Sequence, residues 1–317
     1  MEYLILILSL AGIVLGADFL VKGAVVVARK CRVSSFVIGA VIVGIGTSLP
    51  ELVVSTVGAI GGNSEVAIGN VVGSNIFNVF AILGLTALFF PIAVSRENMK
   101  FEIPFCIAVS ILLMLLVYNF FIVGEPRLGR WDGAALLLVF TSFMWISLRR
   151  GKNSAATVGE SVEEENKSLW FAAFSILGGL AALIVSSNFF VDEAVAIARK
   201  LGVSDAFISI TLLACGTSLP ELAASVTAAV KKDTDMALGN IIGSNIFNAT
   251  MILGTASLIT PLTTGKIGLV DYGAMILAAV LPMIFGIRGK ITRIEGLLML
   301  LCYAAYTWYI VTYVMAV

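Results

Sequence analysis

The chain has 317 residues, of which 59% are hydrophobic and 13% are charged, and its mean hydropathy is +1.04. Because soluble domains carry about 25% charged residues, this composition excludes a soluble globular protein and indicates an integral membrane protein, with the lipid bilayer as its partner. The net charge is zero. Histidine is absent, and its absence argues against a histidine-ligated metal site or a histidine proton relay. We expect no nucleic-acid partner.

Ten apolar segments follow one another along the chain, each with roughly the 20 residues that a transmembrane helix needs. The first begins at Leu4 with no basic segment before it, so we expect it to remain as a span rather than to be a cleaved signal peptide. The segments are 4–26, 35–60, 66–92, 101–123, 131–149, 169–196, 205–230, 235–261, 268–287 and 294–316.

A polar stretch at 150–168 separates the first five segments from the last five. The two halves repeat, since residues 46–78 and 216–248 are identical at 18 of 33 positions. Because each half has an odd number of spans, the second copy must enter the membrane from the opposite side, which is the inverted-topology repeat of secondary transporters. The predicted domains are a five-helix repeat (1–149), a short linker (150–168) and a second, inverted five-helix repeat (169–317).

The distribution of basic residues predicts the orientation in the membrane. With the N-terminus outside, the inside loops hold fourteen Lys and Arg residues, and the outside loops hold five. The positive-inside rule therefore places both termini outside the cell and the linker 150–168 in the cytoplasm.

The hexapeptide GTSLPE occurs at 46–51 and again at 216–221. Pro50 lacks an N–H and its ring clashes with the carbonyl of Gly46, so the second segment should break near the middle of the membrane. Main-chain carbonyls freed at that depth must be satisfied by protein, water or an ion. The polar groups beside the first break are Thr47, Ser48, Glu51 and carbonyls near Gly44; beside the second, formed by Gly216 and Pro220, they are Thr217, Ser218, Glu221 and carbonyls near Ala214.

A second repeated motif, GNxxGSNIFN, lies at 69–78 and 239–248. The GxxxG spacing in each copy allows helices to approach closely. The serine and the last asparagine of each copy are four residues apart and so share a helix face. We expect each pair to meet the break of its own half, with Ser74 and Asn78 near Glu51, and Ser244 and Asn248 near Glu221.

All of these polar groups offer oxygen atoms, which are the ligands that hard cations prefer, and Ca²⁺ takes about 6–8 of them. Because neither half has a Lys or Arg at comparable depth, the two buried glutamates should be neutralised by transported cations. A single glutamate after proline could be a protonated structural acid, but two copies in inverted halves favour a cation site. The weaker candidates are Asp18 and Asn188, which could equally form interhelical hydrogen bonds, and Asp271, which we expect at the membrane interface.

The paired GTSLPE and GSNIFN segments resemble the two repeats of the sodium/calcium exchanger family, within the cation/calcium antiporter superfamily, in the form without a regulatory cytoplasmic domain. The resemblance covers nearly the whole chain. It implies an all-α integral membrane protein of ten helices in two inverted five-helix repeats, with helices 2, 3, 7 and 8 broken around a midplane cation site. The implied ion ligands are Glu51, Glu221, Thr47, Ser48, Ser74, Asn78, Thr217, Ser218, Ser244 and Asn248, with main-chain oxygens near Gly44 and Ala214.

The same resemblance implies antiport of Na⁺ against Ca²⁺ across the plasma membrane by alternating access, with no catalytic residues and no cofactor. Several members of the family place an aspartate at the position of Asn248, and in the potassium-dependent branch that acid is linked to K⁺ use. The asparagine here therefore predicts K⁺-independent exchange. Two glutamates neutralise one Ca²⁺ but not three Na⁺, so the exchange is expected to be electrogenic.

The sequence leaves three other functions to be considered. A proton/calcium antiporter of the same superfamily typically carries a GNxxE-type motif, where this chain has Gly-Ser. A cation channel fits inverted repeats with broken helices less well than alternating access does. An intramembrane protease would use aspartates in YD and GxGD contexts, which are absent, so we expect no enzymatic activity. The sequence is compatible with a monomer.

Overall fold

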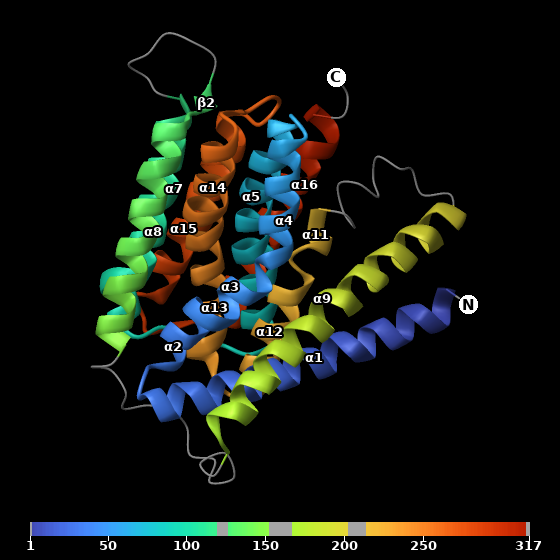
Figure 1. Cartoon of the computed structure of the whole chain (residues 1–317), viewed down its shortest axis with the longest axis vertical. Helices are drawn as coiled ribbons and strands as arrows, with labels where there is room; N and C mark the ends of the chain where they lie inside the picture. The colour runs from blue at the N-terminus through green and yellow to red at the C-terminus, as the bar shows by residue number, and fades with distance from the viewer. Residues whose placement is uncertain (1, 119–125, 152–166, 202–213, 315–317) are drawn as a thin grey trace.

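The structure is a computed structural model that describes residues 2–118, 126–151, 167–201 and 214–314. Helices make up nearly all of the described chain, which confirms the predicted all-α class (Figure 1). Several helices contain π-helical segments, labelled η, in which the hydrogen bonds run from one residue to the fifth one along.

The first half of the chain begins with a long helix and continues through shorter helices that carry the repeated motifs. Its elements are α1 (Glu2–Cys31), α2 (Ser35–Ile38), η1 (Gly39–Val43), α3 (Gly44–Thr47), α4 (Leu49–Ile60), α5 (Ser64–Phe77), η2 (Asn78–Leu83), α6 (Gly84–Phe89), β1 (Ile92–Ala93), η3 (Asn98–Glu102), α7 (Ile103–Tyr118), β2 (Arg127–Leu128) and α8 (Arg130–Gly151).

The described elements of the second half follow a similar order from α9 to α16. They are α9 (Leu169–Lys200), α11 (Ala214–Gly216), α12 (Leu219–Val230), α13 (Thr234–Phe247), η6 (Asn248–Ile252), α14 (Leu253–Ile259), β3 (Leu262–Thr263), α15 (Leu269–Gly286), β4 (Lys290–Ile291), α16 (Arg293–Tyr309) and η7 (Ile310–Val314).

Eight helices in the described ranges are long and apolar enough to cross a membrane, and a ninth span results if the bent run of α2, η1, α3 and α4 counts as one. The predicted seventh span, 205–230, begins at residues outside the described chain, and α11 and α12 form its described part. A multi-pass helical membrane protein is therefore confirmed, whereas the count of ten spans stays a prediction.

Two of the four predicted breaks are wrong. The third and eighth predicted spans are continuous helices, Ser64–Phe89 and Thr234–Ile259. Neither contains a proline, so nothing in the backbone forces an interruption, and Pro91 and Pro261 follow only after the helices end. Each helix instead widens into a π-helical segment, η2 or η6, at the last asparagine of its motif. The second span does bend, by 47° between α3 and α4.

These two continuous helices are the most buried spans, with 78% and 83% of their apolar windows inside the structure. The second of them packs closely on α2 and η1, because a Cβ on Gly239 would overlap Phe36 and one on Gly243 would overlap Ala40. The GxxxG spacing of the second copy therefore permits a close helix contact, as predicted.

The helices α1 and α9 form a pair that runs obliquely to the upright helices (Figure 1). Their backbones touch through glycines, since a Cβ on Gly16 would lie 2.9 Å from the carbonyl oxygen of Gly179, and one on Gly179 would lie 2.7 Å from that of Gly16. Two short antiparallel ribbons join the halves of the chain, with β1 paired to β4 and β2 paired to β3.

Candidate ion-binding site

The bend in the second span is centred on Ser48, which has φ −84° and ψ 9° and lies between α3 and α4. Ser218 has nearly the same conformation, φ −92° and ψ 7°, at the start of α12. Pro50 and Pro220 lie in the first turns that follow, where the missing N–H costs no helical hydrogen bond. Each glutamate comes directly after its proline, in a first turn whose dipole favours a negative charge.

The two glutamates are held by hydrogen bonds that cross between the halves. Glu51 and Glu221 are both fully buried. The hydroxyl of Ser48 donates to Oε1 of Glu221 at 2.8 Å, and the hydroxyl of Ser218 donates to Oε1 of Glu51 at 3.0 Å. Each break therefore orients the carboxylate that belongs to the other break, and the two copies of GTSLPE form a single centre.

Several buried oxygen atoms around this centre make no hydrogen bond within the described chain. Leaving a buried polar atom without a partner costs about 1–3 kcal/mol, so native structures rarely do it without a reason. Of the fourteen buried side-chain atoms without a hydrogen bond in the described chain, six belong to residues of the predicted ligand set: Oε2 of Glu51, Oε2 of Glu221, Oδ1 of Asn78, Oδ1 of Asn248, Oγ of Ser74 and Oγ1 of Thr217.

Four asparagines form a crossed amide network beside the glutamates. The side chain of Asn78 donates to Oδ1 of Asn245 at 3.0 Å, and that of Asn248 donates to Oδ1 of Asn75 at 3.2 Å. Asn75 and Asn245 also donate to each other's main-chain carbonyls, at 3.0 and 3.1 Å. The network uses the amide nitrogens of Asn78 and Asn248 and leaves their oxygens available to accept.

The helix contacts also cross between the halves, while the pairing of each asparagine with the glutamate of its own half stays a prediction. The segment η2, which starts at Asn78, packs against α12 with its Glu221, and η6, which starts at Asn248, packs against α4 with its Glu51. The halves interlock, because the continuous helices α5–η2–α6 and α13–η6–α14 cross between the two bent segments.

A second pair of asparagines, which the sequence analysis missed, supports the turns that carry the glutamates. Asn70 donates to the main-chain carbonyl of Glu51 at 3.3 Å and to the hydroxyl of Ser55 at 3.0 Å. Asn240 makes the same contacts with Glu221 at 3.2 Å and with Ser225 at 2.8 Å. Their signal in the sequence is the recurrence of the asparagine of each GN dipeptide, and of the paired serine, at the same offset in both halves.

The remaining predicted ligands of the first break have partners within the protein. The carbonyl of Gly44 accepts from the main-chain N–H of Ser48 at 3.1 Å and from the hydroxyl of Ser244 at 3.2 Å. The hydroxyl of Thr47 lies 3.0 Å from the carbonyl of Val43 and 3.3 Å from Oδ1 of Asn240. An ion bound at this centre would compete with these hydrogen bonds for the same oxygens.

The centre carries two acidic side chains and no basic one among the described contacts. The ion pairs found in the described part of the chain join Asp18 to Lys22, Asp18 to Lys231, and Glu2 to Lys200, and none of them involves Glu51 or Glu221. The described residues also contain no group of three or more His, Cys, Asp or Glu side chains that could hold a metal ion. A cation at the centre would therefore depend on two carboxylates and on neutral oxygens.

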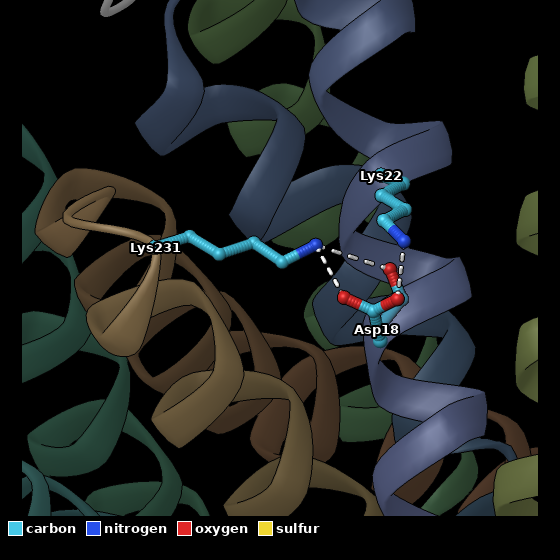
Figure 2. A network of polar contacts seen from close by, with 3 residues as sticks. All are labelled: Asp18, Lys22 and Lys231. Carbon is cyan, nitrogen blue, oxygen red and sulfur yellow. Dashed lines mark hydrogen bonds and ion pairs between the residues drawn. The ribbon is translucent and has the colours of Figure 1, made fainter.

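Asp18, one of the weaker candidates, lies in an ion-pair network away from the glutamates. Its carboxylate is 2.6 Å from the ammonium of Lys22 on the same helix and 2.7 Å from that of Lys231 at the end of α12 (Figure 2). The side chain of Asp18 is 31% exposed, so the network links α1 to α12 at a partly solvated position. This contact between α1 and α12 fits the interhelical role that the sequence suggested for Asp18.

The other two weaker candidates also lie apart from the glutamates. Asn188 is exposed on α9. Asp271 accepts the N–H of Gly268 at 2.7 Å and so caps the start of α15, and it accepts the hydroxyl of Tyr306 at 2.8 Å. These two contacts explain the presence of Asp271 by a structural role, as a helix cap and as the acceptor for Tyr306.

The fold and the centre together define a multi-pass membrane protein with a buried, acidic, oxygen-lined centre built from two copies of one motif. The family model of the sodium/calcium exchanger protein matches residues 1–149 and 171–312 of this chain. The chain therefore belongs to the sodium/calcium exchanger family, whose members are transporters of Na⁺ and Ca²⁺ rather than enzymes and use no cofactor.

Named relatives match the chain over most of its length. Sodium/calcium exchanger MaX1 of Methanosarcina acetivorans is 35% identical over 96% of this chain and 97% of its own. Inner membrane protein YrbG of Escherichia coli is 33% identical over 87% of this chain and 86% of its own. A solved structure of the sodium-calcium exchanger NCX_Mj, soaked with Na⁺ and without Ca²⁺, superposes with a TM-score of 0.83 at 32% identity and covers 98% of each chain.

Proposed function

We propose that the chain is a secondary antiporter that exchanges Na⁺ for Ca²⁺ at one centre between Glu51 and Glu221. The observation that carries the proposal is the pair of fully buried carboxylates, each with one oxygen that makes no hydrogen bond within the described chain. Two such charges without a basic partner are costly in a membrane interior unless a cation binds them. Membership of the exchanger family supports Na⁺ and Ca²⁺ as the cations.

The proposed ligands are oxygens that converge on this centre from both halves. Carboxylates supply the charge, and hydroxyl, amide and main-chain oxygens complete the coordination that Ca²⁺ or Na⁺ requires. The set is Glu51, Glu221, Thr47, Ser48, Ser74, Asn78, Thr217, Ser218, Ser244, Asn248 and the carbonyls of Gly44 and Ala214.

The exchange is electrogenic and independent of K⁺ in this proposal. One Ca²⁺ neutralises the two carboxylates, whereas three Na⁺ leave one positive charge, so a cycle that exchanges them moves net charge. The amides of Asn78 and Asn248 add no further negative charge that could balance a K⁺ ion. Their hydrogen bonds to Asn245 and Asn75 support neutral amides at both positions.

The two halves, 1–149 and 169–317, are proposed to be inverted repeats that alternate access to the centre. Inverted repeats with interrupted helices serve this purpose in secondary transporters. The bias of basic residues supports a plasma-membrane orientation with both termini outside and the linker 150–168 in the cytoplasm.

The test is ⁴⁵Ca²⁺ uptake into proteoliposomes that hold the purified protein. Vesicles loaded with Na⁺ and diluted into Na⁺-free medium should take up Ca²⁺, while vesicles with equal outward K⁺ or H⁺ gradients should not. Uptake driven by the H⁺ gradient alone would favour a proton/calcium antiporter instead. Uptake without any counter-gradient would favour a channel.

A further inference from the structure

A cavity of about 450 Å³, whose lining shares no residue with the ion-binding centre, lies where α15 ends and the helix of η3 and α7 begins. Three basic side chains line it: Arg96, Lys100 and Arg288. All three are exposed, no acidic residue lines the cavity, and none of the three forms an ion pair in the described part of the chain. Three like charges around one concavity repel each other, so an anion bound among them would be stabilised.

The main chain adds to this positive potential. The helix Asn98–Tyr118 is 21 residues long and begins beside the cavity, with Met99 and Lys100 of its first turn in the lining. A helix N-terminus carries a partial positive charge and N–H groups that suit anions, above all phosphate. The N–H groups of Asn98 and Met99 already donate to the hydroxyl and the carbonyl of Ser95, at 3.1 Å each, so the helix contributes chiefly through its dipole.

The cavity is also partly apolar, because Val94, Met99 and Ile287 share its lining with the cations. Ile287 continues an exposed apolar face along the last turns of α15, where Met283 is 37%, Ile284 is 51% and Ile287 is 74% exposed. In a membrane protein such a face contacts acyl chains. A ligand that fills both regions has an anionic head and an apolar tail.

We propose that this cavity binds the phosphate headgroup of an anionic phospholipid, with its acyl chains along Met283, Ile284 and Ile287. Basic pockets at the ends of membrane helices recognise such headgroups. The orientation given under the proposed function places the cavity in the cytoplasmic leaflet. The lipid site is separate from the centre at the glutamates and does not depend on which cations are exchanged.

The repeat provides an internal comparison. The ribbons match Ile92 of β1 to Leu262 of β3, an offset of 170, and Lys290 of β4 to Arg127 of β2, an offset of 163. With the offset of 170 the counterparts of Arg96 and Lys100 on the opposite face are Lys266 and Val270. The described counterparts hold one cation where the cavity has two, so Lys266 offers a matched control for Arg96.

The test is native mass spectrometry of the delipidated full chain, titrated with phosphatidylglycerol and with phosphatidylcholine of the same acyl chains. The wild type should bind one phosphatidylglycerol at least about tenfold more tightly than phosphatidylcholine. Each of Arg96→Gln, Lys100→Gln and Arg288→Gln should weaken phosphatidylglycerol binding about fivefold, the equivalent of about 1 kcal/mol per cation. Lys266→Gln should bind like the wild type.

Equal affinity of the wild type for the two lipids would overturn the proposal, and this comparison needs no variant to fold. Unchanged binding by a folded triple variant, checked by gel filtration, would overturn it too. A competition experiment with glycerol 3-phosphate distinguishes a site for a lipid headgroup from a site for a soluble phosphate compound. Displacement of phosphatidylglycerol at equal concentration would show a site for a soluble phosphate and would overturn the assignment to lipid.

Discussion

The hydroxyl of Ser48 donates a hydrogen bond of 2.8 Å to the carboxylate of Glu221, which lies 173 residues further along the chain. The contact of Ser218 with Glu51, at 3.0 Å, is its counterpart. Each half therefore contributes a hydrogen bond to the acid of the other half. A shift of one break relative to the other would change both hydrogen bonds and the separation of the two carboxylates together.

Ser48→Ala should raise the KM for Ca²⁺ about tenfold to a hundredfold, because a hydrogen bond to a charged group contributes about 1.5–3 kcal/mol. Ser218→Ala should have an effect of similar size, since its contact is the equivalent one. The measurement is the Ca²⁺ dependence of Na⁺-driven ⁴⁵Ca²⁺ uptake. Ser110→Ala is the control, because the hydroxyl of Ser110 is also buried but donates only to Cys106 within its own helix. Loss of affinity in the control alone would contradict the role of the crossed contacts.

Glu51→Gln and Glu221→Gln should each abolish Ca²⁺ exchange. The amide keeps the shape of the side chain but removes half of the charge at the centre, and at contact distance that charge attracts a cation by several kcal/mol at an effective dielectric constant of about 20. The same uptake assay measures the loss. Asp192→Asn, which removes an exposed acid from α9, should leave transport unchanged. Near-normal uptake by either glutamine variant would remove these acids from the proposed site.

Asn248→Asp should alter cation selectivity or coupling more than it alters folding, because the two side chains are nearly isosteric and the change adds a third negative charge. In the wild type, Ca²⁺ flux should need no K⁺ on the Ca²⁺ side. The test compares fluxes in K⁺-free and K⁺-containing media while valinomycin fixes the membrane potential. A strict K⁺ requirement in the wild-type protein would show that the count of charges at the centre is mistaken.

Membrane potential should drive the exchange if three Na⁺ move against one Ca²⁺. In Na⁺-loaded vesicles each cycle then exports one net positive charge, so an interior-positive K⁺/valinomycin potential should speed Ca²⁺ uptake and an interior-negative one should slow it. The energy involved is about 2.3 kcal/mol per charge for each 100 mV. An uptake rate that does not change with the membrane potential would indicate two Na⁺ per Ca²⁺ instead.

Gly243→Ala should destabilise the protein by about 1–3 kcal/mol, because its new Cβ would overlap Ala40 and push α13 away from η1. The change should lower the thermal unfolding temperature in detergent. Gly178→Ala is the matched control, since Gly178 also lies inside a long helix but is exposed, with no described atom within 4 Å of the added Cβ. Alanine favours helix over glycine, so the control should be neutral or slightly stabilised. Equal losses in both variants would contradict the packing argument.

Much of the fold followed from local chemistry. The membrane class follows from composition, and the break at Ser48 follows from Pro50, whose missing N–H acts wherever the segment lies. The recurrence of GTSLPE and GSNIFN was enough to select the buried acids, the unpaired oxygens of Asn78 and Asn248, and the family. The count of ten spans remains a prediction, since the start of the seventh lies outside the described chain.

The partners of these groups depended on tertiary structure. Motif spacing relates Asn248 to Glu221 within one half, and only the structure shows that η6 also packs against α4 of the other half. The same packing brings Ser48 to Glu221 and sets Asn75 and Asn245 between the halves. A sequence determines which groups a helix face presents, because that depends on neighbours a few residues away. Which faces meet is decided by the packing of helices about 170 residues apart. The spacing of motifs along the chain does not predict that packing.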